Sequence, residues 1–269
     1  MKRLLFAFLL LTFYFSTAQT DSCGIRISLL TCTPGTELYS TFGHSALRVF
    51  DSTSNHDLVF NYGTFDFYDP GFTRKFVKGK LLYFVDTSSL PSFMAEYEYY
   101  KRGVTEQVIN LACEEKKQMV AALYENIKEE NKFYLYDFNY DNCTTRLRDI
   151  LEKAAGKQLE TKNIVPLPGA TSFRHLIHTY LDRGGQQWSK LGIDILLGTP
   201  MDKKVTNREA MFLPDYLLMA FDSSTLNGKP VVSEKKILLN YFDEYKTKTV
   251  ITPSLVFWIL FIVVFALTI

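Results

Sequence analysis

Strand patterns crowd the first part of this chain and helix patterns fill its last part, and this separation narrows the choice of fold. The stretch 172–221 is helical in pattern and is punctuated by Gly–Gly and Thr–Pro pairs. Strands are expected near 25–30, 45–50, 58–62, 80–86, 105–111 and 236–240. This order of elements is typical of an α+β domain, and the polar turn at 51–57 indicates an antiparallel hairpin. Two more helices are expected at 91–101 and 114–128.

The first 18 residues predict a secretory signal peptide that is removed near Ala18. Lys2 and Arg3 precede an apolar stretch that runs to Phe15, and small residues follow it. A basic start, a short apolar run and a small-residue cleavage site are the three parts of such a signal. An uncleaved anchor helix is the alternative. The body of the protein is therefore expected outside the cytoplasm.

Residues 251–269 contain no charged side chain and predict a transmembrane helix. Nineteen residues at about 1.5 Å each span roughly 28 Å, close to the thickness of a bilayer's hydrocarbon core. The run is expected either as a tail anchor or as the first of several membrane helices. A buried core helix is disfavoured because no polar face interrupts the apolar residues.

Residues 19–225 are expected to form one domain with a helical C-terminal part, and residues 226–250 to connect it to the membrane segment. The formal net charge is +1 and no dense run of Lys and Arg appears, which argues against nucleic acid as a partner. His175 and His178 lie three residues apart, but no carboxylate spacing completes a metal site. Neither a metal nor another cofactor is expected.

The four cysteines, Cys23, Cys32, Cys113 and Cys143, would enter an oxidising space on export. Cys23 and Cys32 are near enough in sequence to form a local disulfide. The state of Cys113 is left open. Cys143 must stay a free thiol if it is to react.

A helix that follows Asp141 and Asn142 is predicted to hold Cys143 in its first turn. Asp and Asn are frequent N-cap residues, and Gly156 is the expected end of the helix. Its apolar positions share the face of Cys143, so the thiol should point toward the sheet. The helix dipole and the unpaired backbone N–H groups favour a thiolate there, and the same N–H groups can stabilise an oxyanion.

His44 is the base that this thiol would need. It follows Gly43, which allows a sharp turn, and it precedes the strand at 45–50. A nucleophile and a base held on separate elements are the least that a thiol acyl-transfer enzyme requires. The returning hairpin strand should supply a polar group that orients the imidazole, with Asn61 as the first choice and Asp66 as the second.

Four side chains are predicted to contact a substrate: Arg48, Tyr62, Asp66 and Arg146. Arg146 lies about 60° from Cys143 around the helix and could bind a phosphate. An ion pair with a nearby Asp is the alternative for Arg146, and Arg48 has the same status. Arg148 falls on the far side of the helix and is expected in solvent.

Spaced blocks of sequence carry a resemblance to a known family. They are YSTFGHSALR at 39–48, FNYGTFDF at 60–67, KGKL at 78–81, NYDNCTTRL at 139–147 and FLPDYL at 212–217. In this order they resemble the N-terminal extracytoplasmic domain of the Lnb-type lipoprotein N-acyltransferases, over most of residues 25–225. The resemblance implies a circularly permuted papain-like fold of the NlpC type, with the histidine before the cysteine.

Carried over to this sequence, the resemblance implies that Cys143 is the nucleophile and His44 the general base. Cys143 would take an acyl chain from a phospholipid as a thioester. The free amine of a diacylglyceryl-cysteine lipoprotein would then attack it and become acylated. A thioester reacts with amines more readily than the ester from which it came. The implied location is the bacterial inner membrane, with the domain on the periplasmic side.

Two other functions are open on the residues alone. A cell-wall peptidoglycan or peptide amidase, or an endopeptidase, would use the same Cys–His dyad with water as the acceptor. A membrane-tethered binding module without catalysis would hold Cys143 as a structural residue. An acyl adduct on Cys143 would separate the first function from these two.

Overall fold

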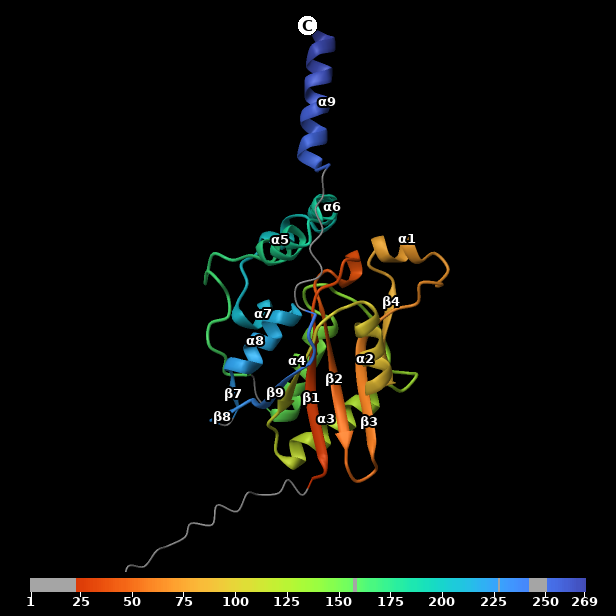
Figure 1. Ribbon diagram of the computed structural model, residues 1–269, viewed down its shortest axis with the longest axis vertical. Helices are drawn as coiled ribbons and strands as arrows, with labels where there is room; N and C mark the ends of the chain where they lie inside the picture. The colour runs from red at the N-terminus through yellow and green to blue at the C-terminus, as the bar shows by residue number, and fades with distance from the viewer. Residues whose placement is uncertain (1–22, 157–158, 227, 242–250) are drawn as a thin grey trace, which may run out of the picture.

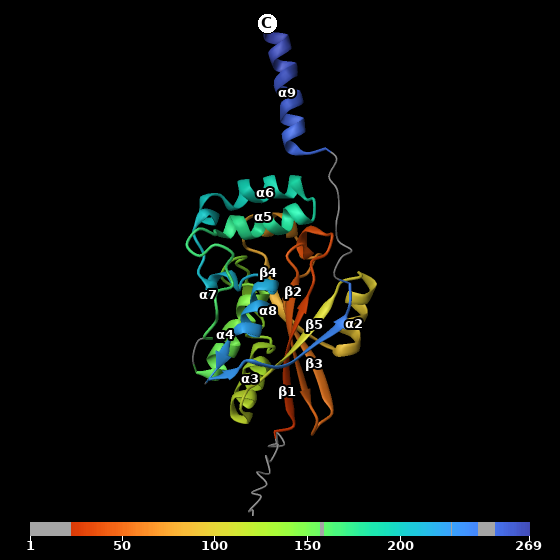
Figure 2. The same cartoon turned by 60° about the vertical axis from the view of Figure 1, so that its left-hand side comes forward.

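An antiparallel sheet of seven strands is the centre of the domain, with helices on both faces and beyond one end (Figure 1, Figure 2). The computed structural model describes residues 23–156, 159–226, 228–241 and 251–269. Within them the strand order is β6-β4-β3-β2-β1-β5-β9, and a separate ribbon joins β7 (Thr225–Leu226) to β8 (Lys229–Pro230). The predicted α+β class with an antiparallel sheet is confirmed.

The sheet strands overlap every predicted strand. They are β1 (Ile25–Cys32), β2 (His44–Asp51), β3 (His56–Thr64), β4 (Leu82–Ser89), β5 (Val104–Ile109), β6 (Phe133–Leu135) and β9 (Val232–Leu239). The predicted hairpin joins β2 to β3, with Asp51 opposite His56. In the β1–β2 pair, Cys32 lies opposite His44. The end of β1 and the start of β2 therefore share one end of the sheet.

The helices follow the predicted order, with one addition and one division. They are α1 (Phe72–Val77), α2 (Leu90–Tyr99), α3 (Cys113–Asn126), α4 (Cys143–Ala155), α5 (Phe173–Arg183), α6 (Gln187–Leu197), α7 (Asn207–Ala210), α8 (Pro214–Ser223) and α9 (Pro253–Thr268), with 3-10 turns η1 (Leu38–Ser40) and η2 (Thr199–Asp202). The sequence did not predict α1. The last part of the helical stretch predicted at 172–221 is divided into α7 and α8, because Pro214 has no N–H to continue a helix and instead begins α8.

Each central strand is buried on both faces of the sheet. Because successive side chains of a strand point to opposite faces, Ile27 and Leu29 pack in the cluster that covers α3, α4 and α8, whereas Leu30 and Cys32 pack with Phe93 of α2. Figure 2 shows α2 on one side of the sheet and α3, α4 and α8 on the other. Helices α5 and α6 lie beyond the end of the sheet at which β2 begins (Figure 2).

The disulfide of this protein joins Cys23 to Cys113, at the start of α3, with 5.4 Å between the Cα atoms. The local bond between Cys23 and Cys32 is therefore a wrong expectation. Strand β1 separates these two residues by roughly 30 Å at about 3.3 Å per residue, and a disulfide needs Cα atoms within about 7 Å. Cys32 and Cys143 are free.

The predicted transmembrane segment forms a helix that is shorter than expected. The side chain of Thr252 caps α9 by accepting a hydrogen bond from the N–H of Leu255, and the helix has 16 residues. At 1.5 Å per residue it is about 24 Å long, against about 30 Å for a bilayer's hydrocarbon core. Among the helices of the described residues, none is long and apolar enough to cross a membrane, so the structure does not show the membrane helix predicted for 251–269. The predicted signal peptide, 1–18, lies outside the described residues.

Candidate active site

Asn142 fixes the place where α4 begins, and with it the position of Cys143. Its side-chain oxygen accepts hydrogen bonds from two backbone N–H groups of the first turn, at 2.9 and 2.8 Å. Its amide nitrogen donates to the carbonyl oxygens of Phe138 and Phe212, both at 2.8 Å. Asn142 is only 2% exposed, so these bonds replace the water that its amide would otherwise bind. The N-cap thus ties the cysteine to two other segments of the chain.

This capping occupies N–H groups that the sequence predicts to stabilise an oxyanion. The N–H groups of Thr144 and Thr145 bond to the Asn142 side chain, and that of Arg146 bonds to the Asn142 carbonyl. Of the first-turn donors, the backbone N–H of Cys143 itself is the one that could still serve an oxyanion. The helix dipole continues to favour negative charge at the sulfur.

The thiol of Cys143 and the imidazole of His44 lie close enough for each to shift the other's pKa, by charge and by hydrogen bonding. The Nε2 atom of His44 bonds to the Oδ1 atom of Asn61 at 2.5 Å, so Nδ1 is the ring nitrogen left for the sulfur. This is the contact expected of Asn61. Asp66, the second choice, is exposed and accepts a hydrogen bond from the N–H of Tyr68 instead. The structure therefore brings Cys143, His44 and Asn61 together.

The two members of the pair shift each other's pKa toward the charged forms. Burial alone would raise the pKa of the Cys143 thiol, but the charge and hydrogen bond of His44 outweigh it and lower the pKa to about 7. The Thr144 hydroxyl and the backbone N–H of Ser45 act in the same direction. Burial alone would lower the pKa of His44, but the Cys143 thiolate and the bond to Asn61 raise it. A thiolate–imidazolium pair is the result, and it is a strong nucleophile beside a proton donor.

Two glycines let the backbone approach this pair closely. Gly43 has φ of +81°, and a Cβ there would lie 2.8 Å from the carbonyl oxygen of Cys32. Gly63 has φ of +87° at the irregular point of β3, and a Cβ there would lie 3.4 Å from the Cβ of Cys143. Any other residue would be strained at both positions. The predicted sharp turn before His44 is confirmed.

The family model for the Lnb N-terminal periplasmic domain matches residues 13–179, more than half of the chain. The match includes His44, Asn61 and Cys143. This chain belongs to the Lnb N-terminal domain family. No curated protein and no solved structure matches the chain significantly. A family of periplasmic domains implies an extracytoplasmic location, which agrees with the location expected from the sequence.

In this Lnb-type domain, a row of aromatic side chains, called here the aromatic wall, lies beside the thiol. The sequence did not predict these side chains as part of the site. Tyr136 lies against Gly63, 3.8 Å from the position of a Cβ there, and stacks on Tyr83 with 4.4 Å between ring centres. Tyr83 contacts Phe65 at 5.2 Å, and Phe65 contacts Phe67 at 4.6 Å. Phe67 is 60% exposed, so this aromatic wall runs from the thiol to the surface.

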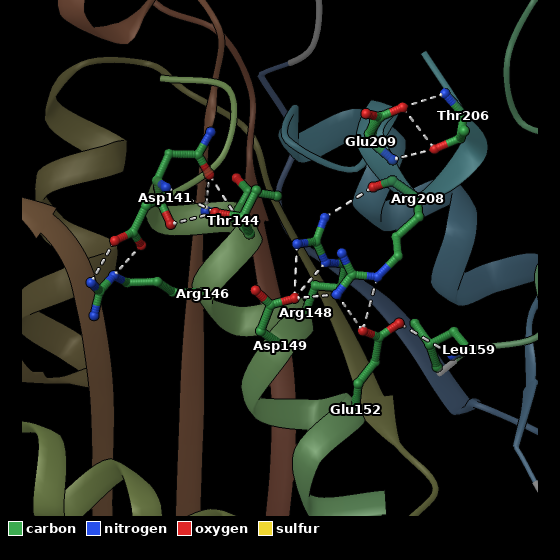
Figure 3. Close-up of polar contacts among 12 residues, drawn as sticks. Asp141, Thr144, Arg146, Arg148, Asp149, Glu152, Leu159, Thr206, Arg208 and Glu209 are labelled. Atoms are coloured by element: carbon green, nitrogen blue, oxygen red, sulfur yellow. Dashed lines mark hydrogen bonds and ion pairs between the residues drawn. The ribbon is translucent and has the colours of Figure 1, made fainter. Parts of the chain in front are cut away.

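Arg146 lies near the pair on α4, but its guanidinium is already held. It donates to the two carboxylate oxygens of Asp141 at 2.6 and 2.8 Å (Figure 3). It also lies 3.5 Å above the ring of Tyr134. The ion pair that the sequence left open is present, and substrate binding by Arg146 stays a prediction.

A second ionic network fastens the middle of α4 to α7 (Figure 3). Arg208 binds Asp149 at 2.7 Å and Glu152 at 2.8 Å, and Arg148 donates to the carbonyl oxygen of Arg208 at 2.9 Å. Arg148 is buried, which corrects its expected place in solvent. The network holds α4 against the segment that also presents Phe212 to Asn142.

Arg48 lies away from the thiol, and the hydroxyl of Tyr62 is bound to a residue outside the site. Arg48 lies four residues along β2 from His44, roughly 13 Å at about 3.3 Å per residue. Its guanidinium binds Asp57 at 2.7 Å and Glu106 at 2.9 Å. The buried hydroxyl of Tyr62 accepts a hydrogen bond from Asn126 of α3 at 2.7 Å. Both side chains make structural contacts here.

Proposed function

We propose that this domain is a thiol acyltransferase that moves an acyl chain from a phospholipid, through a thioester on Cys143, to the amine of a diacylated lipoprotein. The observation that carries the proposal is the contact of Cys143, His44 and Asn61 at the start of α4. A circularly permuted papain-like domain is the fold proposed for it, because a sheet histidine meets a cysteine at a helix N-terminus. The proposed place of action is the periplasmic face of the inner membrane.

In the first half-reaction the Cys143 thiolate attacks the carbonyl carbon of the ester. A carbon–sulfur bond forms and the carbon–oxygen bond of the ester breaks. The His44 imidazolium gives its proton to the departing glyceryl oxygen, so the products are a thioester and a lysophospholipid. Asn61 keeps the ring of His44 oriented during this transfer, because its oxygen holds Nε2.

In the second half-reaction the unprotonated amine of the lipoprotein attacks the thioester carbon. A carbon–nitrogen bond forms, the carbon–sulfur bond breaks, and the sulfur leaves as a thiolate. Neutral His44 accepts the proton that the amine loses. The pair returns to its thiolate–imidazolium form, and an amide has replaced an ester without an oxidant or a reductant.

The aromatic wall favours a lipid as the acyl donor. It gives an acyl chain an apolar surface that begins at the thiol, and each buried methylene of such a chain contributes about 0.8 kcal/mol. Further aromatic residues extend it, since the half-buried Phe72 of α1 contacts Phe67 at 5.5 Å and Tyr68 is 93% exposed. A cell-wall peptide would gain little from these surfaces.

The test is the intact mass of the full chain in detergent micelles with a phospholipid that carries isotopically labelled acyl chains. We expect one labelled acyl adduct on Cys143. A synthetic diacylated lipopeptide should then remove the adduct and gain the same mass. Cys32→Ala is the matched control for Cys143→Ala, because both variants remove a buried free thiol. Only Cys143→Ala should prevent the adduct.

Two further arms separate the alternatives. With the lipopeptide but no phospholipid, an adduct would mean that the acyl group comes from the lipopeptide's own diacylglyceryl ester, and the phospholipid part of the proposal would be wrong. Cleavage of peptidoglycan fragments by Cys143, without an acyl adduct, would establish an amidase. Absence of both reactions in a folded protein would contradict the proposal and leave the binding module as the remaining alternative.

A further inference from the structure

A polar pocket of about 170 Å³ lies at the same end of the sheet as the active site. One wall is η1, which precedes His44 by a few residues, and the other is the end of α2 with Lys101 and Arg102. Cys32 is paired with His44 on one side and with Val104 on the other. The segments that form this pocket are therefore neighbours of the strand end that carries His44.

Arg102 is the most buried cation of the pocket, with 9% of its surface exposed. Its Nε atom donates to the carbonyl oxygen of Thr33 at 2.8 Å, and the guanidinium lies 4.8 Å from the ring centre of Tyr97. Its Nη2 atom is buried and has no hydrogen-bond partner among the described residues. Arg102 also lines the pocket, so its positive charge lies at the pocket wall, where it attracts an anionic group.

Lys101 stands where the backbone favours glycine. It follows the end of α2 with φ of +50°, in the left-handed region. Helices commonly end with a glycine in this conformation, because a Cβ there is strained. A lysine at this position keeps a cation on the pocket at the expense of local backbone strain, and strain of this kind collects at functional sites.

The pocket also presents negative charge. Glu37 and Glu96 line it, and both are exposed. The exposed rings of Tyr39 and Tyr100 lie on the same surface. A purely anionic ligand would be repelled by the two carboxylates, whereas a ligand with one negative and one positive group matches both pairs of charges. The rings add attraction for an ammonium group.

We infer that this pocket binds the zwitterionic headgroup of a phospholipid, with the phosphate at Arg102 and Lys101 and the ammonium between Glu37 and Glu96. The inference rests on the proposed function, in which a phospholipid is the acyl donor. A headgroup held in this headgroup pocket keeps the glycerol esters at the end of the sheet that carries His44 and its partner thiol.

The test uses the Cys143→Ala protein in detergent, titrated calorimetrically with glycerophosphoethanolamine, a soluble headgroup without acyl chains. Glycerophosphoglycerol and inorganic phosphate are the comparison probes, and the zwitterion should bind more tightly than both. Lys101→Gly should weaken its binding about fivefold, the effect of losing one partly exposed charge. The same variant should not lower the melting temperature, because glycine removes the strain at φ of +50°.

Asn55→Gly is the matched control. Asn55 also has a left-handed backbone, with φ of +54°, but it lies in the β2–β3 turn at the opposite end of the sheet. It should leave the affinity unchanged. Equal affinities of the Lys101→Gly and Asn55→Gly proteins would overturn the inference. Inorganic phosphate that binds as tightly as the zwitterion would also overturn it, in favour of a simple anion site.

A further comparison separates this inference from the proposed function. The titration involves no acyl transfer, so tight binding of the zwitterion supports the headgroup pocket even if Cys143 forms no acyl adduct. A normal adduct combined with no binding overturns the headgroup pocket alone. Glu96→Gln should reduce the preference for the zwitterion over glycerophosphoglycerol, and an unchanged preference would contradict the assignment of the ammonium.

Discussion

The two free cysteines of this domain differ in chemistry although both are buried. Cys143 is 8% exposed and Cys32 is fully buried. The pKa of the Cys143 thiol is lowered to about 7, whereas that of Cys32 is raised to about 12. At neutral pH the Cys143 thiol therefore ionises far more readily than the Cys32 thiol, which remains protonated.

Their surroundings explain the difference. Burial raises the pKa of Cys32, and the charge of Arg102 and the hydrogen bond of Tyr97 offset only part of that effect. Burial also opposes the ionisation of Cys143, but this thiol lies at a helix N-terminus in contact with His44, and both features lower its pKa. Cys32 is the strand partner of His44 and still lacks this contact. Reactivity here depends on which side chain meets the imidazole and not on distance along the sheet.

The largest expected effect is that of Cys143→Ala, which should lower acyl transfer to the lipopeptide at least about a thousandfold, as the loss of a nucleophile does in enzymes that form covalent intermediates. The change removes the atom that holds the acyl chain. The initial rate of lipopeptide acylation, followed by mass spectrometry, measures it. A variant with more than a tenth of the normal rate would show that Cys143 is as dispensable as Cys32.

Substitution of the base should make Cys143 resemble Cys32. In His44→Gln, burial is no longer outweighed by the charge of the imidazolium, so the thiol pKa should rise from about 7 to above its ordinary value. At pH 7 the thiolate fraction, and with it the rate of alkylation by iodoacetamide, should fall about a hundredfold. The pH dependence of alkylation measures this shift. An inflection that stays near pH 7 would mean that His44 does not set the thiol pKa.

Loss of the orienting residue should have a smaller effect. Asn61→Ala leaves the imidazole in place but frees its Nε2, so acyl transfer should fall about tenfold through misorientation of the ring. Because the bond to Asn61 raises the pKa of His44, its loss should also move the alkylation inflection of Cys143 slightly above 7.

Asn126→Ala is the matched control for this variant. It removes another partly buried amide contact, to the neighbouring Tyr62, without touching His44. It should lower stability and leave the alkylation profile unchanged. If both variants shift the profile equally, Asn61 acts through general stability and not through the imidazole.

Local signals in the sequence were sufficient for the centre of the site. Asn142 before Cys143 predicted an N-cap, and the helix ends at Gly156 as expected because that glycine adopts φ of +69°. Gly43 before His44 and the position of Asn61 on the return strand were also informative. These features depend on neighbours within one turn or one hairpin, where residue type strongly limits conformation.

Contacts between residues far apart in the sequence could not be predicted from such local signals. The bond from Asn142 to Phe212 spans 70 residues, and the disulfide between Cys23 and Cys113 spans 90. Both depend on which helix packs on which face of the sheet. The same is true of Arg148. Its position on the helix predicted exposure to solvent, but in the structure α7 packs over it. The length of α9 depended instead on where its cap formed, at Thr252.

The smallest expected effect is that of Cys32→Ala. Acyl transfer should stay within about twofold of normal, because a buried thiol of this kind behaves as a small apolar side chain. The free energy of unfolding should fall by about 1 kcal/mol, since the sulfur leaves a small gap beside Tyr97. Urea denaturation measures the loss, and alkylation of the native wild-type protein at pH 7 should modify Cys143 while Cys32 reacts only after unfolding. Equal labelling of both thiols in the native state would remove the contrast, because it would mean that burial in the sheet protects neither cysteine and that His44 is not what distinguishes them.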